Sequence, residues 1–97
     1  MAALAPTTAT VTFLDLPESK YTLRKPVLVE IEPDEAGFVV SEQSTGVFFY
    51  DPDMSKSLTG FMHAFVDEFE FLQRNETHLS PSLLAELERF RSLLVER

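Results

Sequence analysis

The first half of the chain alternates hydrophobic and polar residues with the period of two that β-strands require. Within residues 26–32, every second side chain from Val27 onward is β-branched and aliphatic, whereas Glu30 and Glu32 share the opposite side with Leu28. This pattern predicts a half-buried strand whose hydrophobic side faces a core. Pro26 suits the start of such a strand, where its missing N–H costs least.

Short segments rich in turn residues separate this strand from its neighbours. The β-branched and aromatic content of three further segments predicts strands at 10–14, 38–42 and 47–50. The sequence therefore predicts an antiparallel meander of three strands, or four with the N-terminal one, occupying residues 10–50.

The pattern changes to a helical period after the sheet. Hydrophobic residues recur three and four positions apart over 53–73, with Asp53 or Ser55 as the N-cap. Gly60 lies in mid-helix, where it costs about 1 kcal/mol relative to Ala, and we expect it to allow close packing on the sheet. The predicted hydrophobic stripe consists of Met54, Leu58, Phe61, Met62, Phe65, Phe69 and Leu72.

A second amphipathic helix is predicted over 80–96, with Ser80 as its N-cap and Pro81 at its first position. Its predicted hydrophobic stripe consists of Leu83, Leu84, Leu87, Phe90 and Leu94. The predicted fold class is therefore α+β, an antiparallel three- to four-stranded β-meander followed by two amphipathic helices packed on one face. The 97 residues predict a single domain, with residues 1–10 flexible.

Composition narrows the classes of protein that fit. The chain has no cysteine, which excludes disulfide scaffolds, cysteine-based metal sites and thiol nucleophiles. No segment has the pattern of a signal peptide or approaches the roughly 20 apolar residues of a membrane span. We therefore expect a cytoplasmic protein that does not bind membranes.

The net charge of −8 is concentrated in the middle of the chain. Residues 26–73 hold ten acidic residues against one basic residue, Lys56, a net charge of −9. Such a surface repels nucleic-acid phosphates and steers association with a basic partner, although net charge also serves solubility alone. No direct binding of nucleic acid is expected.

The sequence lacks a recognisable catalytic or metal-binding motif. His63 lies four residues before Asp67, a spacing that divalent ions use, but ordinary surface residues are the favoured interpretation. Asp51 and Asp53 flank Pro52 and are explained more simply by a turn and a helix cap. We therefore expect no enzyme activity, no cofactor and no metal.

What remains is a binding surface. Large apolar residues in 47–50 point to both faces of the predicted sheet, and only one face can lie under the helices. The other face is covered either by the second helix or N-terminal strand, or by a partner, and sheet edges also invite pairing. The candidate partner-binding residues are Glu30, Glu32, Phe48, Tyr50, Asp67 and Glu70.

From Leu23 to Leu94 the chain resembles the HicB-like group of antitoxin-type domains. The matching stretches are RKPVLVEIEPDEAGFVVSE, GVFFYDPDMSKSLTGFMHAFVDEFEFL and LSPSLLAELERFRSLL. The Gly-Asp-Thr and Glu-Ala elements usual before the helix are replaced by residues 51–57, and no DNA-binding segment follows. The resemblance implies a partner-neutralising or regulatory module that does not bind an operator unaided, and it supplies no catalytic residues.

Three hypotheses follow. The first is a non-enzymatic, antitoxin-type protein that binds and masks a basic partner, for example a ribonuclease toxin. The second is an acidic inhibitor that mimics DNA and competes for the site of a nucleic-acid enzyme. The third is a homodimeric accessory subunit in which helix and sheet faces pair across a two-fold axis.

Overall fold

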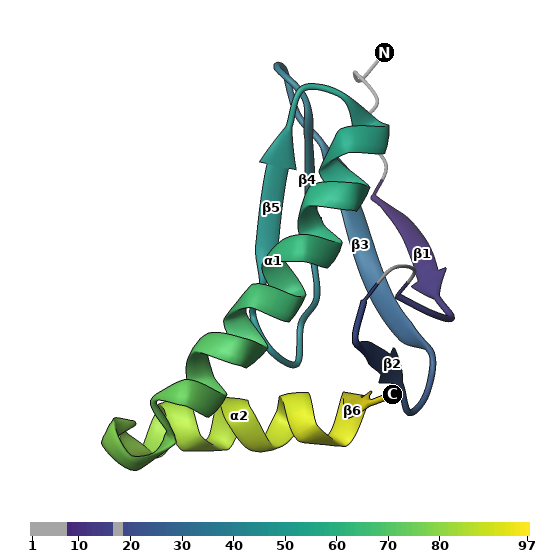
Figure 1. Ribbon diagram of the computed structural model, residues 1–97. Coiled ribbons are helices and arrows are strands. Elements are labelled where there is room, and N and C mark those ends of the chain that lie inside the picture. Colours follow the sequence, from purple (N-terminus) through teal and green to yellow (C-terminus); the bar gives the residue numbers. More distant parts are fainter. Residues whose placement is uncertain (1–7, 17–18) are drawn as a thin grey trace.

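The alternating segments of the first half form a four-stranded antiparallel sheet in the order β1-β3-β4-β5. The computed structural model describes residues 8–16 and 19–97 of the chain. The sheet strands are β1 (Ala9–Phe13), β3 (Val27–Pro33), β4 (Phe38–Ser41) and β5 (Phe48–Asp51). Two helices follow the sheet, as Figure 1 shows, so the α+β class with a strand meander and two helices is confirmed.

The pairing of the strands fixes which side chains share a face. Val11 lies opposite Val29 in the β1–β3 pair, Ile31 lies opposite Val40, and Val40 lies opposite Phe49. Because paired residues point to the same side of a sheet, these side chains form one inner face. Val29 and Val40 are completely buried there, as the period of two predicts.

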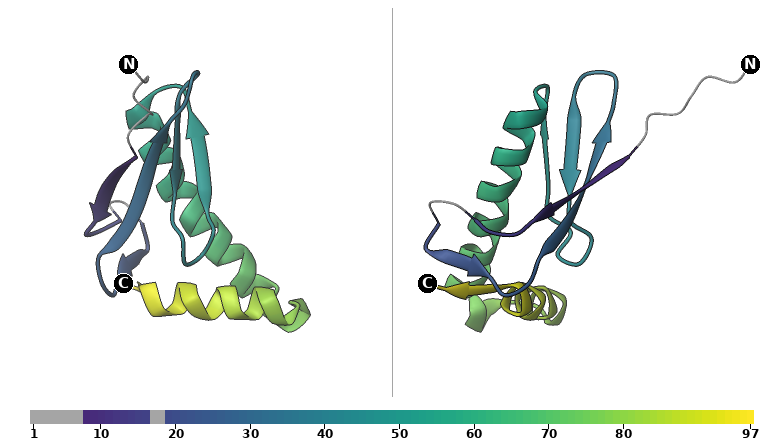
Figure 2. Two further views of the ribbon diagram at one scale, coloured as in Figure 1. Left: turned by 180° about the vertical axis from the view of Figure 1, so that it is seen from behind. Right: turned by 90° about the vertical axis from the view of Figure 1, so that its right-hand side faces the viewer.

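The helix α1 (Met54–Arg74) covers this inner face. Asp53 caps its N-terminus, since the Asp53 carboxylate accepts a hydrogen bond of 2.9 Å from the Lys56 N–H. Phe61, Phe65 and Phe69 are buried between α1 and the rest of the molecule, whereas Met54 is exposed. The right-hand view of Figure 2 shows α1 on one side of the sheet and no helix on the other.

Gly60 brings α1 and β5 close together. A Cβ atom at this position would lie within 2.6 Å of three atoms of the Phe49 ring, closer than real Cβ atoms approach other atoms. The close packing predicted for Gly60 is therefore confirmed. Gly37 has a similar role in the β3–β4 hairpin, where a Cβ would lie 2.6 Å from the Asp51 carbonyl oxygen.

The hairpin loop between β4 and β5 is organised by one buried carboxylate. Glu42 accepts hydrogen bonds of 2.6–2.8 Å from both the N–H and the hydroxyl of Ser44 and of Thr45. Burial alone would raise the pKa of Glu42, but these hydrogen bonds outweigh it and hold the pKa below its usual value. Gly46, with φ of 76°, closes the loop.

The second helix, α2 (Pro81–Leu93), begins as predicted, after the cap Ser80 and a 3₁₀ turn η1 (Glu76–His78). Its predicted end at residue 96 is wrong, because Leu94–Glu96 form a strand, β6. This strand pairs with β2 (Tyr21–Leu23), a second strand that the sequence analysis did not predict. Leu94 would be buried in a longer helix as well as in a strand, but only a strand provides hydrogen-bond partners for the backbone N–H and C=O groups of β2. Leu83 and Leu84 are also exposed, at 37% and 38%, contrary to the predicted stripe.

The C-terminal end of α2 is attached to the segment between β2 and β3. The Arg24 N–H donates to the Leu93 carbonyl oxygen at 2.7 Å, and Arg24 Nε donates to the carbonyl oxygens of Arg91 and Leu94. A guanidinium group at this position stabilises the negative end of the helix dipole. As Figure 1 shows, α2 therefore runs across from the end of α1 to the β2–β6 pair.

Aromatic rings form the core where the sheet and the helices meet. The Phe61 ring lies between those of Phe13 and Phe65, and the Phe90 ring of α2 contacts both Phe65 and Phe69 with centroids 4.9 and 5.7 Å apart. Such pairs contribute about 0.5–1.5 kcal/mol beyond their buried area.

Ala9 and Thr10, which belong to the segment 1–10 predicted to be flexible, form the start of β1 and pair with Ile31 and Glu30. The prediction for residues 1–7 lies outside the described residues.

Candidate protein-interaction surface

The face of the sheet opposite α1, here called the outer face, carries exposed hydrophobic side chains. Phe48 is 69% exposed, Leu28 is 61% exposed and Tyr50 is 41% exposed. Neither α2 nor β1 covers this face in the described residues, so the first of the two sequence alternatives for its cover fails. The outer face consists of Thr10, Thr12, Leu28, Glu30, Glu32, Val39, Ser41, Phe48 and Tyr50.

The strand that carries Phe48 and Tyr50 is also an edge of the sheet. The Glu42 N–H donates to the Val47 carbonyl oxygen at 3.0 Å, and the Glu42 carbonyl oxygen accepts from the Gly46 N–H, so Glu42 and Val47 occupy a hydrogen-bonded position of the ladder. Hydrogen-bonded pairs alternate along an antiparallel ladder, so Phe49 also bonds to β4, whereas the N–H and C=O of Phe48 and Tyr50 point away from it. The β5 edge therefore offers backbone donors and acceptors beside two exposed aromatic side chains.

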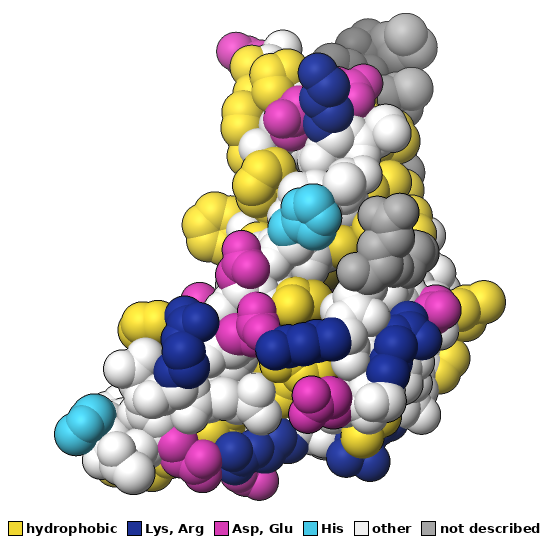
Figure 3. Space-filling model, viewed as in Figure 1, with side chains coloured by type: hydrophobic (Ala, Val, Ile, Leu, Met, Phe, Trp, Pro, Cys, Tyr) yellow, Lys and Arg dark blue, Asp and Glu magenta, His cyan; other side chains and the backbone are white. Residues whose placement is uncertain are grey.

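The charges of the outer face differ from those of the helical side. Figure 3, which views the side of α1 and α2, shows Lys and Arg side chains interspersed with acidic ones. Within the described residues, the ion pairs are Lys20–Glu70, Arg91–Glu76, Arg91–Glu88 and Arg97–Asp15, at 2.8–3.0 Å. None of them involves Glu30 or Glu32, so the outer face keeps its negative charge.

A shallow depression of about 290 Å³ crosses the outer face near these carboxylates. Gln43 donates a hydrogen bond of 3.2 Å to Glu30 at its rim. The depression is lined by Thr10, Leu28, Glu30, Ser41, Glu42, Gln43 and Ser44. With Leu28 and two glutamates in its lining, the depression suits an apolar or basic side chain better than an anion.

The structure divides the six predicted partner-binding residues into two groups. Glu30, Glu32, Phe48 and Tyr50 share the outer face. Asp67 is exposed on α1, which lies on the other side of the sheet.

Glu70, also on α1, forms a 3.0 Å ion pair with Lys20 and accepts a hydrogen bond from the Tyr21 hydroxyl. The hydrogen bond from Lys20 lowers the pKa of Glu70 against the opposing effect of burial. Because Glu70 is engaged within the molecule and α1 faces away from the outer face, Asp67 and Glu70 do not join the other four candidates.

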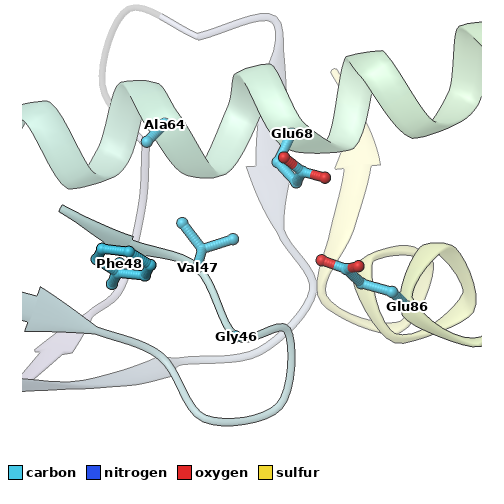
Figure 4. Close-up of a pocket in the computed structure, with 6 residues that line it drawn as sticks. All are labelled: Gly46, Val47, Phe48, Ala64, Glu68 and Glu86. Carbon is cyan, nitrogen blue, oxygen red and sulfur yellow. The ribbon is translucent and has the colours of Figure 1, made fainter. Parts of the chain in front are cut away.

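A second hollow, here called the corner pocket, lies where the start of β5 meets the two helices. It has a volume of about 260 Å³ and is lined by Gly46, Val47, Phe48, Ala64, Glu68 and Glu86. In Figure 4 the carboxylates of Glu68, from α1, and Glu86, from α2, point into the same space. Burial, and then the negative charge of Glu68, raise the pKa of Glu86.

Sequence reasoning did not single out Glu68 or Glu86. Each lies beside the hydrophobic stripe of its own helix. Their approach depends on how α1 and α2 cross, which no local pattern encodes.

The two histidines give no metal site. His63 and His78 are both exposed, and within residues 8–16 and 19–97 no group of three or more His, Asp or Glu side chains is placed to hold a metal ion.

Comparisons with known proteins found no match to this chain. The chain matches no protein-family model, no curated protein and no solved structure. Among the described residues, no helix combines the length and apolarity needed to cross a membrane.

Proposed function

We propose that this chain is a non-enzymatic protein-binding module of the antitoxin type, which pairs the β5 edge with an extended segment of a basic partner protein. The observation that carries the proposal is Phe48, a 69% exposed aromatic side chain on an edge strand whose backbone groups at that residue point outward. Burying a Phe side chain contributes about 1.5–3 kcal/mol, and each backbone hydrogen bond adds about 0.5–1.5 kcal/mol.

Charge supports a basic partner over a second copy of the chain. The outer face beside β5 carries Glu30 and Glu32 without ion pairs, and residues 26–73 have a net charge of −9. Two such surfaces repel each other, whereas a basic segment is attracted and guided to the edge. Raising the salt concentration should therefore slow association.

The resemblance to HicB-like domains supports the same proposal. Neutralising a basic nuclease needs a binding surface and no catalytic group. We therefore place the proposed cellular role with a toxin-like or otherwise regulated basic partner, in the cytoplasm.

The test places a photo-crosslinking phenylalanine analogue at position 48 and, as a control, at Leu83, an exposed hydrophobic residue of α2. After irradiation in the lysate of the native host, the expected product is a basic protein crosslinked from position 48 and not from position 83. Crosslinking to a second copy, or to the nucleic-acid site of an enzyme in competition with DNA, would contradict the proposal and favour the homodimer or the DNA mimic.

Two variants of one residue then separate the side chain from the backbone. Phe48→Thr removes the aromatic ring and keeps the N–H, whereas Phe48→Pro also removes the outward N–H, which β4 does not use. With the identified partner, we expect at least a tenfold loss of affinity for Phe48→Thr and a further loss for Phe48→Pro. Equal affinities for the wild type and Phe48→Pro would overturn the proposed edge pairing.

A further inference from the structure

The corner pocket lies beside the β5 edge on the side of the sheet that faces α1. Val47, at the start of this edge, and Ala64 of α1 provide its apolar wall, and Glu68 and Glu86 provide two carboxylates. Ala64 and Glu68 are four residues apart on α1 and therefore lie on the same side of the helix. A pocket with an apolar wall and two carboxylates is complementary to a long side chain that ends in a positive charge.

The positive charge of Arg89 offsets only part of the effect of burial and of Glu68 on Glu86, and neither carboxylate of the pocket has a direct partner within the described residues. No ion pair or side-chain hydrogen bond there involves Glu68 or Glu86, although Arg89 and Arg91 lie on the same helix as Glu86. Arg91 is engaged with Glu76 and Glu88. Burial, and then the nearby charge of Glu68, raise the pKa of Glu86, which agrees with a half-buried carboxylate that lacks a direct cationic partner.

The register of β5 brings a strand paired with it into reach of this pocket. The Val47 carbonyl oxygen accepts from the Glu42 N–H on the β4 side, so on its open side Val47 would face a residue of an antiparallel partner strand in a non-hydrogen-bonded pair. In such pairs the side chains lie close together on one face of the sheet. The partner residue opposite Val47 therefore projects its side chain toward α1, into the corner pocket.

We propose that the corner pocket is a specificity site that receives one lysine or arginine side chain from the segment paired with the β5 edge. The aliphatic stem of that side chain packs on Val47 and Ala64, and its charged end lies between the carboxylates of Glu68 and Glu86. This inference rests on the proposed function, and it adds that the basic partner is recognised at a fixed position of its extended segment.

The test uses phage-displayed random dodecapeptides selected on the whole protein at physiological salt. The wild type should select peptides with one invariant Lys or Arg position, and the Glu68→Gln/Glu86→Gln variant should lose this invariance. The control is Asp67→Asn/Glu35→Gln, which removes the same net charge from two exposed positions and should keep the invariance. The Gln variant removes a repulsion and should therefore fold, which a urea unfolding curve checks.

Synthetic versions of the peptides selected by the wild type then measure the coupling between the basic peptide residue and the two carboxylates of the pocket. A peptide with the invariant basic residue should lose about tenfold in affinity for the Gln variant, whereas its counterpart with Gln at that position should bind both proteins equally. Selected peptides that need Phe48 but show no fixed basic position would overturn this inference and leave the proposed function standing. Selected peptides that bind the Phe48→Pro variant as well as the wild type would overturn both.

Discussion

The contact between Gly60 and Phe49 gives a prediction opposite to ordinary helix behaviour. In an exposed helix, Gly→Ala stabilises by about 1 kcal/mol because glycine loses more backbone freedom on folding. Here the added Cβ would lie within 2.6 Å of three atoms of the Phe49 ring, so either the ring or α1 must move. Overpacking of this kind costs about 1–3 kcal/mol, so Gly60→Ala should destabilise the protein by up to about 2 kcal/mol.

A double-mutant cycle isolates the contact. Phe49→Val keeps a β-branched side chain on β5 and removes the ring, so that Gly60→Ala in this background should stabilise by about 1 kcal/mol. Urea unfolding followed by circular dichroism gives the four free energies of unfolding, and the coupling should exceed about 1 kcal/mol. If Gly60→Ala stabilises the protein equally in both backgrounds, α1 does not approach β5 as described.

Three further predictions concern the loops and the C-terminal strand. Glu42→Gln should lower the free energy of unfolding at neutral pH by about 2 kcal/mol. Because the pKa of Glu42 is lowered by folding, its contribution is present above the unfolded pKa and is lost as the pH falls through the folded one; acid titrations of the Gln variant should lack this loss. Gly37→Ala should cost about 1–3 kcal/mol in urea unfolding, since its Cβ would meet the Asp51 and Pro52 backbone, and no change would refute that contact. Leu94→Ala should cost about 2–5 kcal/mol in the same assay if Leu94 is buried in β6, and much less if this end of the chain frays.

The elements that could be predicted from the sequence are those specified by local patterns. The alternation in residues 26–32 placed β3 and its buried face, and Asp53 and Ser80 marked the starts of both helices. Their capping depends only on residues two or three positions along the chain.

The elements that sequence reasoning missed depend on distant parts of the chain. The strands β2 and β6 have three residues each and lie more than 70 positions apart, and Leu94 fits a helical stripe as well as a strand. The predicted site failed in a similar way. The charge pattern of residues 26–73 placed Glu70 and Glu30 in one acidic surface, although they lie on opposite sides of the sheet. It also gave no reason to expect Glu68 and Glu86 to lie near each other.

The attachment of α2 at both of its ends has a consequence for the thermodynamics of binding. The first turn of α2 follows α1 through the short turn η1, and its last turn packs on α1 through the Phe90 ring and is held by Arg24 and the β2–β6 pair. The sheet, α1 and α2 are thus connected in a triangle, so that none of the three can move relative to the others without breaking these contacts. The backbone segments that carry Glu68 and Glu86 are therefore positioned before a ligand arrives, so association there costs mainly side-chain entropy and little backbone entropy.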